Sequence, residues 1–492
     1  MTSKHKIPSM VDALIPIISL IIMLALSVYL YGDASSSGAN QIALLLGACI
    51  AAIVGIKNGY VWREIEKGIV KGISMGMGAI MILLAVGSLI GTWIISGTVP
   101  SMIYYGLEIL SPSIFYFAAC VICALSALSI GSSWTVAGTL GVALIGIAAG
   151  LGLSGPVTAG AVISGAYFGD KMSPLSDSTN LAPAIAGTDL FTHIRHMVWT
   201  TGPSLGIALL LFLIMGLRGE VTGEAGGFEL LQNTIDSTFN VSIFSFIPLI
   251  VVFVLAFKKM PAFPTIMIGA LLGGIFAVIL QPDVVRNFVN QPELSGPLTM
   301  ISGVWTALHS GFILESGVPM VDDLLSRGGM ISMLNTIWLV ICALTFGAVL
   351  ETIGLLDKIV ESILTYVKTT GSLIIATVTT CIGINIIAAD QYIAIVIPGR
   401  MYRAEFARRR LDPRNLSRTL EDAGTITSPL IPWNTCGAYM SASLGVATFA
   451  YLPFCFFNLI NPVVAIIYGL LNIKIEKLDE SHVELVDIGE LK

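Results

Sequence analysis

The sequence predicts an all-α polytopic protein that crosses a membrane many times. Of its 492 residues, 55% are hydrophobic and only 11% are charged, and the mean hydropathy is +0.88. Soluble proteins carry about 25% charged residues. Apolar runs long enough to cross a hydrocarbon core of about 30 Å recur along the chain. Two polar stretches broken by glycine and proline lie inside this apolar sequence, which favours two related halves.

The two polar stretches share Ser-Pro-Leu followed by asparagine and threonine. The first runs over 169–180 and the second over 424–435, with Ser173 and Ser428 lying 255 residues apart (428 − 173). Irregular polar backbone at membrane depth survives only where protein or a water-filled cavity surrounds it. Two such breaks at matching places in two halves point to the binding site of a transporter.

The apolar runs predict the membrane segments in chain order. Uninterrupted runs lie near 11–31, 41–56, 73–95, 197–217, 243–257, 262–280, 330–353 and 452–471. Two more regions, 114–150 and 371–399, are apolar but interrupted near the middle by polar residues. The broken helices predicted over 156–187 and 419–448 contain the Ser-Pro-Leu stretches and complete the set.

Lysine and arginine in short loops indicate the cytoplasmic side of a membrane. They occur at Lys4 and Lys6, in the loop 57–71, at Lys258 and Lys259, and most densely over 400–418. Two stretches carry almost none: 96–113, and 218–242 with Glu220, Glu224, Glu229 and Asp236. The N-terminus is therefore expected inside and these two stretches outside.

These charges agree with one topology only if 114–150 and 371–399 dip into the membrane and return as re-entrant hairpins. Each half then has five crossings, and this odd number makes the two repeats inverted. The predicted organisation is a first repeat over 1–217, an extracytoplasmic linker over 218–242, a second repeat over 243–472 with an insertion at 281–316, and a cytoplasmic tail over 473–492.

Polar oxygens at the breaks and at the hairpin tips predict a cation site in each half. Broken helices free backbone carbonyls, and these together with hydroxyls favour a bare cation such as Na⁺. The first break supplies Ser173, Ser176, Asp177, Ser178, Thr179 and Asn180, facing the first tip with Ser132, Ser133 and Thr135. The second tip supplies Asp390 and Gln391, opposite Thr427, Ser428, Asn434 and Thr435.

Asp177 and Asp390 are the carboxylates predicted to bind the exchanged ions. A carboxylate inside a bilayer is costly and indicates a functional site. One aspartate that holds either a proton or a cation, but not both, couples their movements. The alternative for Asp177 is to cap the helix that starts at Ser178.

Four further acidic residues are candidates for proton binding or coupling: Asp170, Glu351, Glu421 and Asp422. Asp170 has the alternative of a local ion pair with Lys171, and Glu421 and Asp422 could pair with the preceding arginine-rich loop. Lys171 could instead receive the carboxylate of an organic substrate.

Other functional classes find little support in the sequence. It lacks the motifs of zinc proteases, serine hydrolases and nucleotide-binding proteins, so we expect neither an enzyme nor an ATP-driven motor, and no cofactor besides the transported ions. No basic tract is interleaved with aromatic residues, which argues against nucleic-acid binding. Cys120 and Cys123 lie in an apolar run without further ligands and are expected to pack. A channel would need a continuous lining of polar residues, whereas the polar residues of this sequence cluster at the two breaks and the two tips.

The motifs resemble the NhaC-type sodium/proton antiporter family, within the wider ion-transporter superfamily. The matching stretches are Gly165–Asp177, Thr179–Pro183, Gly187–Asp189, His193–Met197, Asp390–Tyr392, Pro398–Arg400, Leu420–Thr425 and Ser428–Cys436. At the first tip, Ser132 stands where the family has threonine, and Ala388-Ala389 replace a glycine-containing approach to Asp390.

This resemblance implies a carrier in the cytoplasmic membrane of a prokaryote that exchanges Na⁺ for H⁺ by alternating access. Both termini are expected in the cytoplasm, with the lipid bilayer as the surroundings. Some members of the family resemble exchangers of malate for lactate and others move amino acids, so a small organic acid or an amino acid is an alternative cargo. Glycine-rich helix faces would allow two copies of the protein to form a homodimer.

Overall fold

The computed structural model describes residues 5–31, 35, 38–218, 227–291 and 293–478. These residues form helices and contain no β-strand, only one isolated bridge between Leu411 and Lys477. The expectations for Lys4, Glu220 and Glu224, and for the tail beyond residue 478, lie outside the described residues.

The first half begins with two antiparallel helices and continues through the first interrupted region and the first break. Its helices are α1 (Met10–Tyr31), α2 (Ala39–Lys57), α3 (Trp62–Ile95), α4 (Thr98–Ile109), α5 (Phe115–Ile130), α6 (Ser133–Val136), the π-helix η3 (Ala137–Gly141), α7 (Val142–Gly150), α8 (Gly155–Met172), α9 (Asp177–Ala186) and α10 (Leu190–Arg218).

The second half repeats much of this order after a short helix, α11 (Gly227–Thr238). Its helices are α12 (Ile247–Phe257), α13 (Ala262–Leu280), α14 (Pro282–Val289), α15 (Gly296–Ser310), α16 (Pro319–Leu325), α17 (Leu334–Thr352), α18 (Leu355–Leu364), α19 (Thr370–Ile387), α20 (Gln391–Arg408), α21 (Pro413–Leu420), the π-helix η6 (Glu421–Thr425), α22 (Thr435–Leu444), α23 (Thr448–Tyr451) and α24 (Phe456–Leu471). Short 3₁₀ turns lie between them, and the region 281–316 holds α14 and α15.

Among the described residues, nine helices are long and apolar enough to cross a membrane, or up to eleven when two sharply bent pairs are each taken as one span. The all-α, multi-span fold class is therefore confirmed. The nine include α19 and both limbs of the region 114–150. Length and hydropathy thus do not separate re-entrant limbs from crossing ones, and the hairpins stay a prediction.

Several helices extend beyond their apolar runs. Helix α3 starts at Trp62 instead of residue 73, and α10 starts at Leu190 instead of residue 197. Hydropathy marks only the apolar part of a helix, because polar and charged turns continue it beyond the hydrocarbon. The stretch 96–113 contains α4, whose first six residues, Thr98–Ile103, are all buried.

Both interrupted regions fold back on themselves. In the first, the Tyr116 hydroxyl near the start of α5 accepts a hydrogen bond from the Ser154 amide after α7, at 2.9 Å. In the second, the hydroxyls of Thr380 in α19 and Tyr402 in α20 lie 2.8 Å apart. The residues before and after each tip are therefore close together, as in a helical hairpin.

Backbone features recur at a constant spacing of 258 residues. Left-handed residues pair as Gly59 with Gly317, Gly131 with Ala389, and Gly187 with Gly445 (317 − 59, 389 − 131 and 445 − 187). Helix N-caps pair as Ser132 with Asp390 and Ser176 with Asn434 (390 − 132 and 434 − 176). The Ser-Pro-Leu spacing is three shorter, because the second break holds three more residues between its serine and the next N-cap.

Helices α5 and α8 lie side by side and run in the same direction. Gly165 of α8 touches the backbone at Cys120, and Gly169, one turn later, touches the backbone at Ala124. No side chain fits at either glycine, and this small-residue pattern allows close helix contact. The C-terminal ends of both helices therefore arrive together, which brings the first tip to the first break.

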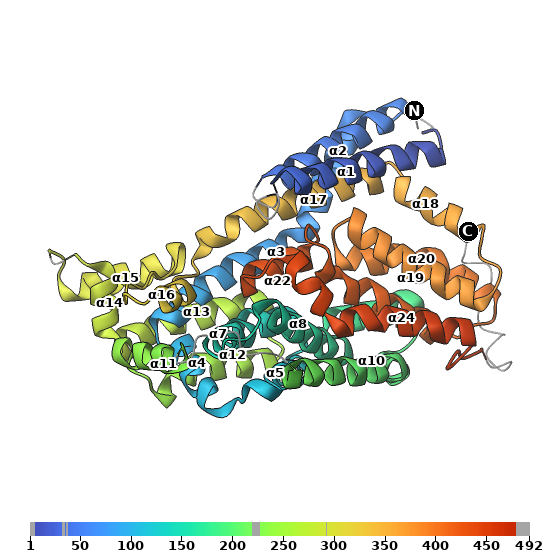
Figure 1. Cartoon of the computed structure of the whole chain (residues 1–492). Coiled ribbons are helices and arrows are strands. Elements are labelled where there is room, and N and C mark those ends of the chain that lie inside the picture. Colours follow the sequence, from blue (N-terminus) through green and yellow to red (C-terminus); the bar gives the residue numbers. More distant parts are fainter. Residues whose placement is uncertain (1–4, 32–34, 36–37, 219–226, 292, 479–492) are drawn as a thin grey trace.

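Figure 1 shows how these elements are arranged. Helices α1 and α2 form a layer at the top of the view, where α17 joins them. The elements of both breaks, including α8, α10, α19, α22 and α24, lie together in the body below. The second break is buried over Ser428–Leu430, whereas the first break has the buried Ser173 and Ser176 beside the exposed Asp177.

Candidate functional site

The first break is held together by its own hydroxyls. Ser176 is the N-cap of α9 and accepts a hydrogen bond from the Thr179 amide at 3.4 Å. The Thr179 hydroxyl donates to the carbonyls of Asp170 (3.1 Å) and Lys171 (3.0 Å), which closes the end of α8. The capping role considered for Asp177 is therefore wrong, because Ser176 takes that position and Asp177 is the first residue inside α9.

Two other predicted ligands also support the break. The Asn180 amide donates to the carbonyls of Pro174 (3.0 Å) and Ser176 (2.7 Å). The Ser173 hydroxyl accepts a hydrogen bond from the Leu175 amide at 3.3 Å. These side chains fix the path of the backbone through the break.

The carboxylate that meets the first tip belongs to Asp170, not to Asp177. It accepts hydrogen bonds from the amide (3.0 Å) and the hydroxyl (2.6 Å) of Ser133. The Ser176 hydroxyl and the Asp177 carboxylate lie near the same carboxylate. The local ion pair considered between Asp170 and Lys171 is wrong. Asp177 itself is exposed and makes no hydrogen bond or ion pair within the described part of the chain.

The first tip is preorganised by local contacts. Ser132 is the N-cap of α6, and its hydroxyl accepts hydrogen bonds from the Thr135 amide (3.2 Å) and hydroxyl (3.0 Å). Gly131 before it is left-handed, and a Cβ there would lie 2.7 Å from the carbonyl carbon of Leu175 in the break. Only glycine therefore lets the tip approach the break this closely.

The second tip carries its carboxylate on the tip itself. Asp390 is buried and N-caps α20, accepting hydrogen bonds from the amides of Tyr392 (2.8 Å) and Ile393 (3.1 Å). The residue before it, Ala389, adopts a left-handed φ of 58° that non-glycine residues rarely take. Its carbonyl accepts a hydrogen bond from the Thr435 amide at 2.9 Å, which joins the tip to the second break.

The other predicted residues of the second half lie at this junction. The side-chain amide oxygen of Gln391 accepts hydrogen bonds from the Ser428 hydroxyl (3.4 Å) and the Cys436 thiol (3.3 Å). The Asn434 side chain N-caps α22 and accepts from the Cys436 amide at 3.0 Å. The structure therefore brings Asp390, Gln391, Ser428, Asn434 and Thr435 together.

Two residues at the site were missed by the sequence reasoning. Asn385, buried in the last turn of α19, donates to the Gly424 carbonyl (2.6 Å) and to the Thr427 hydroxyl (3.0 Å). Tyr167 of α8 is fully buried near Asp170, and its hydroxyl has no hydrogen-bond partner among the described residues. A lone asparagine in an apolar run was a signal for the first, and the tyrosine lies in the family-matching stretch Gly165–Asp177, but neither was given a role.

Contacts between the halves join the two sites. The ring of Trp134 in the first tip stacks on Tyr439 of α22, with centroids 4.1 Å apart, and the Tyr439 hydroxyl donates to the Trp134 carbonyl at 2.7 Å. The phenol of Tyr392 in the second half lies within electrostatic reach of Asp170, Asp177 and Asp390. The three aspartates therefore surround one region of the protein.

A buried ion pair links the two broken helices. Lys171 at the end of α8 and Asp422 in η6 are both inaccessible to solvent and form a salt bridge. The Asp422 carboxylate also accepts from the Thr200 hydroxyl and from the Asn461 amide, each at 2.9 Å. Asp422 thus forms an ion pair with Lys171 and a longer one, at 3.9 Å, with Arg418 of the arginine-rich segment, which confirms the predicted alternative for Asp422. A substrate carboxylate would have to compete with Asp422 for Lys171.

The two remaining acidic candidates have no hydrogen-bond partner among the described residues. Glu421 is fully buried in the π-helix η6, a helix type that is rare and often marks functional positions, with Thr425 and Ser178 nearby. Glu351 is half-buried near the end of α17, one turn after Gly347, which touches the backbone at Ala388 in the second tip. Neither carboxylate has a structural partner that would account for its position.

A cavity of about 530 Å³ opens beside the second break. It is bounded by α1, α2 and α17 on one side and by α22 on the other. Its polar lining includes Asn40, Thr336 and Ser441, and it reaches Pro432 inside the break. Water and ions therefore have room to approach the second break from this side.

These features define a class of protein before any comparison is made. Discontinuous helices whose breaks meet capped hairpin tips inside a multi-span bundle are typical of ion-coupled secondary transporters. The chain belongs to the Na⁺/H⁺ antiporter family, whose model matches residues 165–473.

Three relatives illustrate the range of this family. The chain is 40% identical to the Na⁺/H⁺ antiporter NhaC of Alkalihalophilus pseudofirmus, over 89% of this chain and 91% of the relative. It is 39% identical to the malate-2H⁺/Na⁺-lactate antiporter of Bacillus subtilis, over 87% and 88%. It is 38% identical to the arginine/ornithine antiporter ArcD of Halobacterium salinarum, over 98% and 96%. All three are named as antiporters and not as enzymes.

Proposed function

We propose that this protein exchanges Na⁺ for H⁺ by alternating access, with Asp170 as the carboxylate of the first site. The observation that carries this proposal is the pair of hydrogen bonds, at 2.6 and 3.0 Å, from Ser133 of the tip to Asp170 of the break. They place a carboxylate and a hydroxyl at one point of the junction, with the Ser176 hydroxyl nearby. Such hard oxygen ligands suit a desolvated Na⁺.

Exchange follows from competition at this carboxylate. A proton bound to Asp170 removes the charge that attracts Na⁺, and a bound Na⁺ excludes the proton. The hydroxyls of Ser133 and Ser176 lie close enough to supply neutral oxygens to the ion. If the empty, charged carboxylate cannot cross the membrane, each ion moves only in exchange for the other.

The second tip and break form a related site in this proposal. Asp390, Gln391, Ser428, Asn434 and Thr435 would complete it. The recurrence of left-handed residues and N-caps at 258 residues supports two repeats with the same succession of elements. Together with the charge pattern of the loops, it supports inverted repeats, re-entrant hairpins and cytoplasmic termini.

Alternating access is supported by the cavity beside the second break. The cavity separates the layer of α1, α2 and α17 from α22, so relative movement of these parts would open or close a path to Pro432. The Lys171–Asp422 pair ties the two broken helices together and would keep them moving as one unit.

Glu421 would hold a proton in this scheme. A carboxylate with no hydrogen bond is costly to bury in its ionised form. Glu421 lies close to Lys171 and Asp170. Movement of a proton between Glu421 and Asp170 would pass through the interface of the two broken helices.

Proton movement in proteoliposomes tests the proposal. Vesicles that contain the purified protein and a pH gradient are given Na⁺ alone, with choline as the control cation. Prompt collapse of the gradient by Na⁺ supports simple Na⁺/H⁺ exchange. A response only when malate, lactate, arginine or ornithine is also present would contradict it and favour an organic cargo of the kind named for the relatives.

A further inference from the structure

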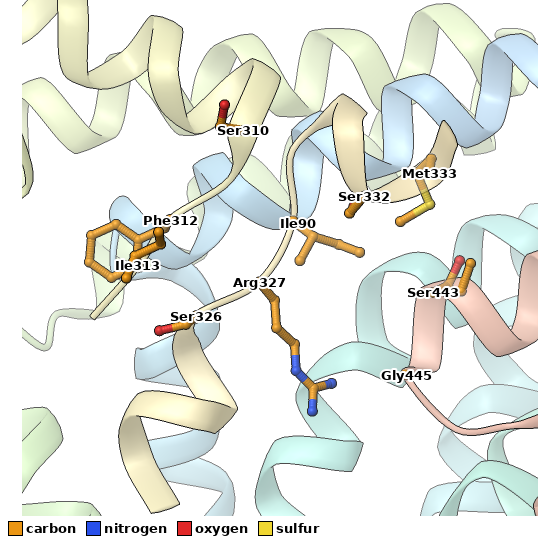
Figure 2. A pocket seen from close by; sticks show the side chains of 12 residues that line it. Ile90, Ser310, Phe312, Ile313, Ser326, Arg327, Ser332, Met333, Ser443 and Gly445 are labelled. Atoms are coloured by element: carbon orange, nitrogen blue, oxygen red, sulfur yellow. The ribbon is translucent and has the colours of Figure 1, made fainter. Parts of the chain in front are cut away.

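A separate cavity of about 320 Å³ lies at the opposite end of α22 from the second break. Figure 2 shows Arg327 in its centre, between the loop that carries it and Gly445 at the end of α22. Helix α22 has ten residues, which corresponds to about 15 Å at 1.5 Å per residue. This cavity is therefore distinct from the proposed site at the second break.

Arg327 is a cation without a carboxylate partner among the described residues. Its guanidinium is half-buried and forms no hydrogen bond or ion pair within the described ranges. Asp323 is near enough to interact electrostatically, but it is exposed and does not pair with it. A partly buried charge that lacks a partner is costly, which favours a bound anion at this position.

The loop that carries Arg327 is fixed to its surroundings. The Arg327 carbonyl accepts a hydrogen bond from the Phe312 amide at 3.1 Å, and the Gly329 amide donates to the Gly87 carbonyl of α3 at 2.6 Å. The Ser326 hydroxyl accepts from the Leu314 amide at 2.9 Å. The backbone thus holds the guanidinium in place, as a preformed binding site requires.

A second polar group in the cavity also lacks a partner. Ser443 of α22 is 3% exposed, and its hydroxyl makes no hydrogen bond within the described ranges. The Tyr439 hydroxyl lies close to it and donates to the Trp134 carbonyl. A ligand in the cavity would give the Ser443 hydroxyl the partner that it lacks.

We infer that this cavity binds a small organic monocarboxylate, whose carboxylate is held by Arg327 and whose other end lies against apolar side chains. A guanidinium fork matches the geometry of a carboxylate, and a single positive charge matches one such group. Ile90, Phe312 and Met333 supply the apolar walls. The volume lies at the lower end of the range typical of small-molecule sites and exceeds the need of a chloride ion.

An arginine at the end of a helix can also stabilise the last carbonyls of that helix. Arg403 provides a matched comparison, because its guanidinium lies against Gly187 at the end of α9 just as that of Arg327 lies against Gly445. Arg403 is exposed. A helix-end role alone would make the two arginines equivalent, whereas a binding role predicts a difference.

Binding can be measured on the full-length protein in detergent by its thermal unfolding. Potassium butyrate and potassium L-lactate are the probes, with potassium chloride and potassium sulfate at equal ionic strength. The inference predicts a saturable rise in Tm with the carboxylates only. An equal rise with chloride or sulfate would overturn the carboxylate assignment, and no rise with any anion would overturn the site.

Variants assign the effect to the cavity. Arg327→Gln should weaken butyrate binding at least tenfold. Ser443→Ala should weaken it about threefold, and alanine is compatible with the helical position of this residue. Arg403→Gln should leave butyrate binding unchanged. Equal loss in Arg403→Gln, or full binding in both Arg327→Gln and Ser443→Ala, would refute the inference. Na⁺-driven exchange measured on the same variants reports on the proposed function separately, because carboxylate binding does not require exchange.

Discussion

The two tip–break junctions use the same succession of elements but place their carboxylates differently. In the first, Asp170 belongs to the broken helix and is bonded across the junction by Ser133 of the tip. In the second, Asp390 belongs to the tip and is bonded by two amides of its own helix, α20. The first carboxylate therefore joins two elements, whereas the second mainly starts one.

This difference determines at which junction a change in charge alters a contact between two elements. A change in charge at Asp170 alters a contact between two elements that can separate, while a change at Asp390 alters a helix cap. Asparagine is also a good N-cap residue. Under the proposed function, the comparison favours the first junction over the second as the place where the proton and Na⁺ compete.

The largest expected effect is the contrast between two asparagine variants. Asp170→Asn should reduce Na⁺-driven proton movement at least a hundredfold, because the amide cannot take up the exchanged proton. Asp390→Asn should reduce it less than tenfold, because the cap is kept. Both are measured as initial rates in proteoliposomes at matched protein content. Equal loss in the two variants would remove the distinction between the junctions.

The next largest effect concerns the pair that joins the two broken helices. Lys171→Met removes the nearer of the two cations beside the buried Asp422, leaving only Arg418 at 3.9 Å, and should cost up to about 3–5 kcal/mol of stability. The double variant Lys171→Met with Asp422→Leu should recover part of this loss, since both members of the close pair are removed and only Arg418 is left without its carboxylate. Thermal unfolding in detergent gives both values. A double variant no more stable than the single one would speak against a simple ion pair.

A smaller effect separates the two serines of the first tip. Ser133→Ala removes the hydroxyl bonded to Asp170 and should raise the Na⁺ concentration for half-maximal exchange severalfold. Ser132→Ala removes only an N-cap and should lower stability by about 1 kcal/mol with little change in that concentration. Both variants are measured by Na⁺ titration of exchange and by thermal unfolding. A larger change in the half-maximal Na⁺ concentration in Ser132→Ala than in Ser133→Ala would contradict the prediction.

The smallest effect concerns the contact between the first tip and α22. Tyr439→Phe keeps the ring stacked on Trp134 but removes the hydrogen bond to its carbonyl, which typically contributes about 1 kcal/mol. We expect a small loss of stability and at most a threefold fall in exchange rate. A complete loss of exchange would assign the tyrosine hydroxyl a role in the ion site itself.

The sequence allowed the fold class, the breaks and the tips to be predicted, because each has a local signal. Apolar runs indicate spans, and Ser-Pro-Leu marks the places where helices stop. The positions of helix starts such as Trp62 and Leu190 were predicted poorly, because hydropathy marks only the part of a helix that lies in the hydrocarbon.

The identity of the central carboxylate could not be predicted, because it depends on which residue faces the tip. Asp177 and Asp170 are seven residues apart across a break (177 − 170), and only the parallel packing of α5 and α8 shows that Ser133 meets Asp170. The pairing of Lys171 with Asp422, 251 residues away, likewise arises from tertiary contact. Sequence reasoning found these residues but not their partners.

The most direct test of the central claim is equilibrium binding of radioactive Na⁺ to purified protein across a range of pH. The account predicts that protons compete with Na⁺ in the unmodified protein, that Asp170→Asn abolishes this competitive binding, and that Asp177→Asn retains it. Binding that survives in Asp170→Asn with the same dependence on pH, or that is lost only in Asp177→Asn, would contradict it.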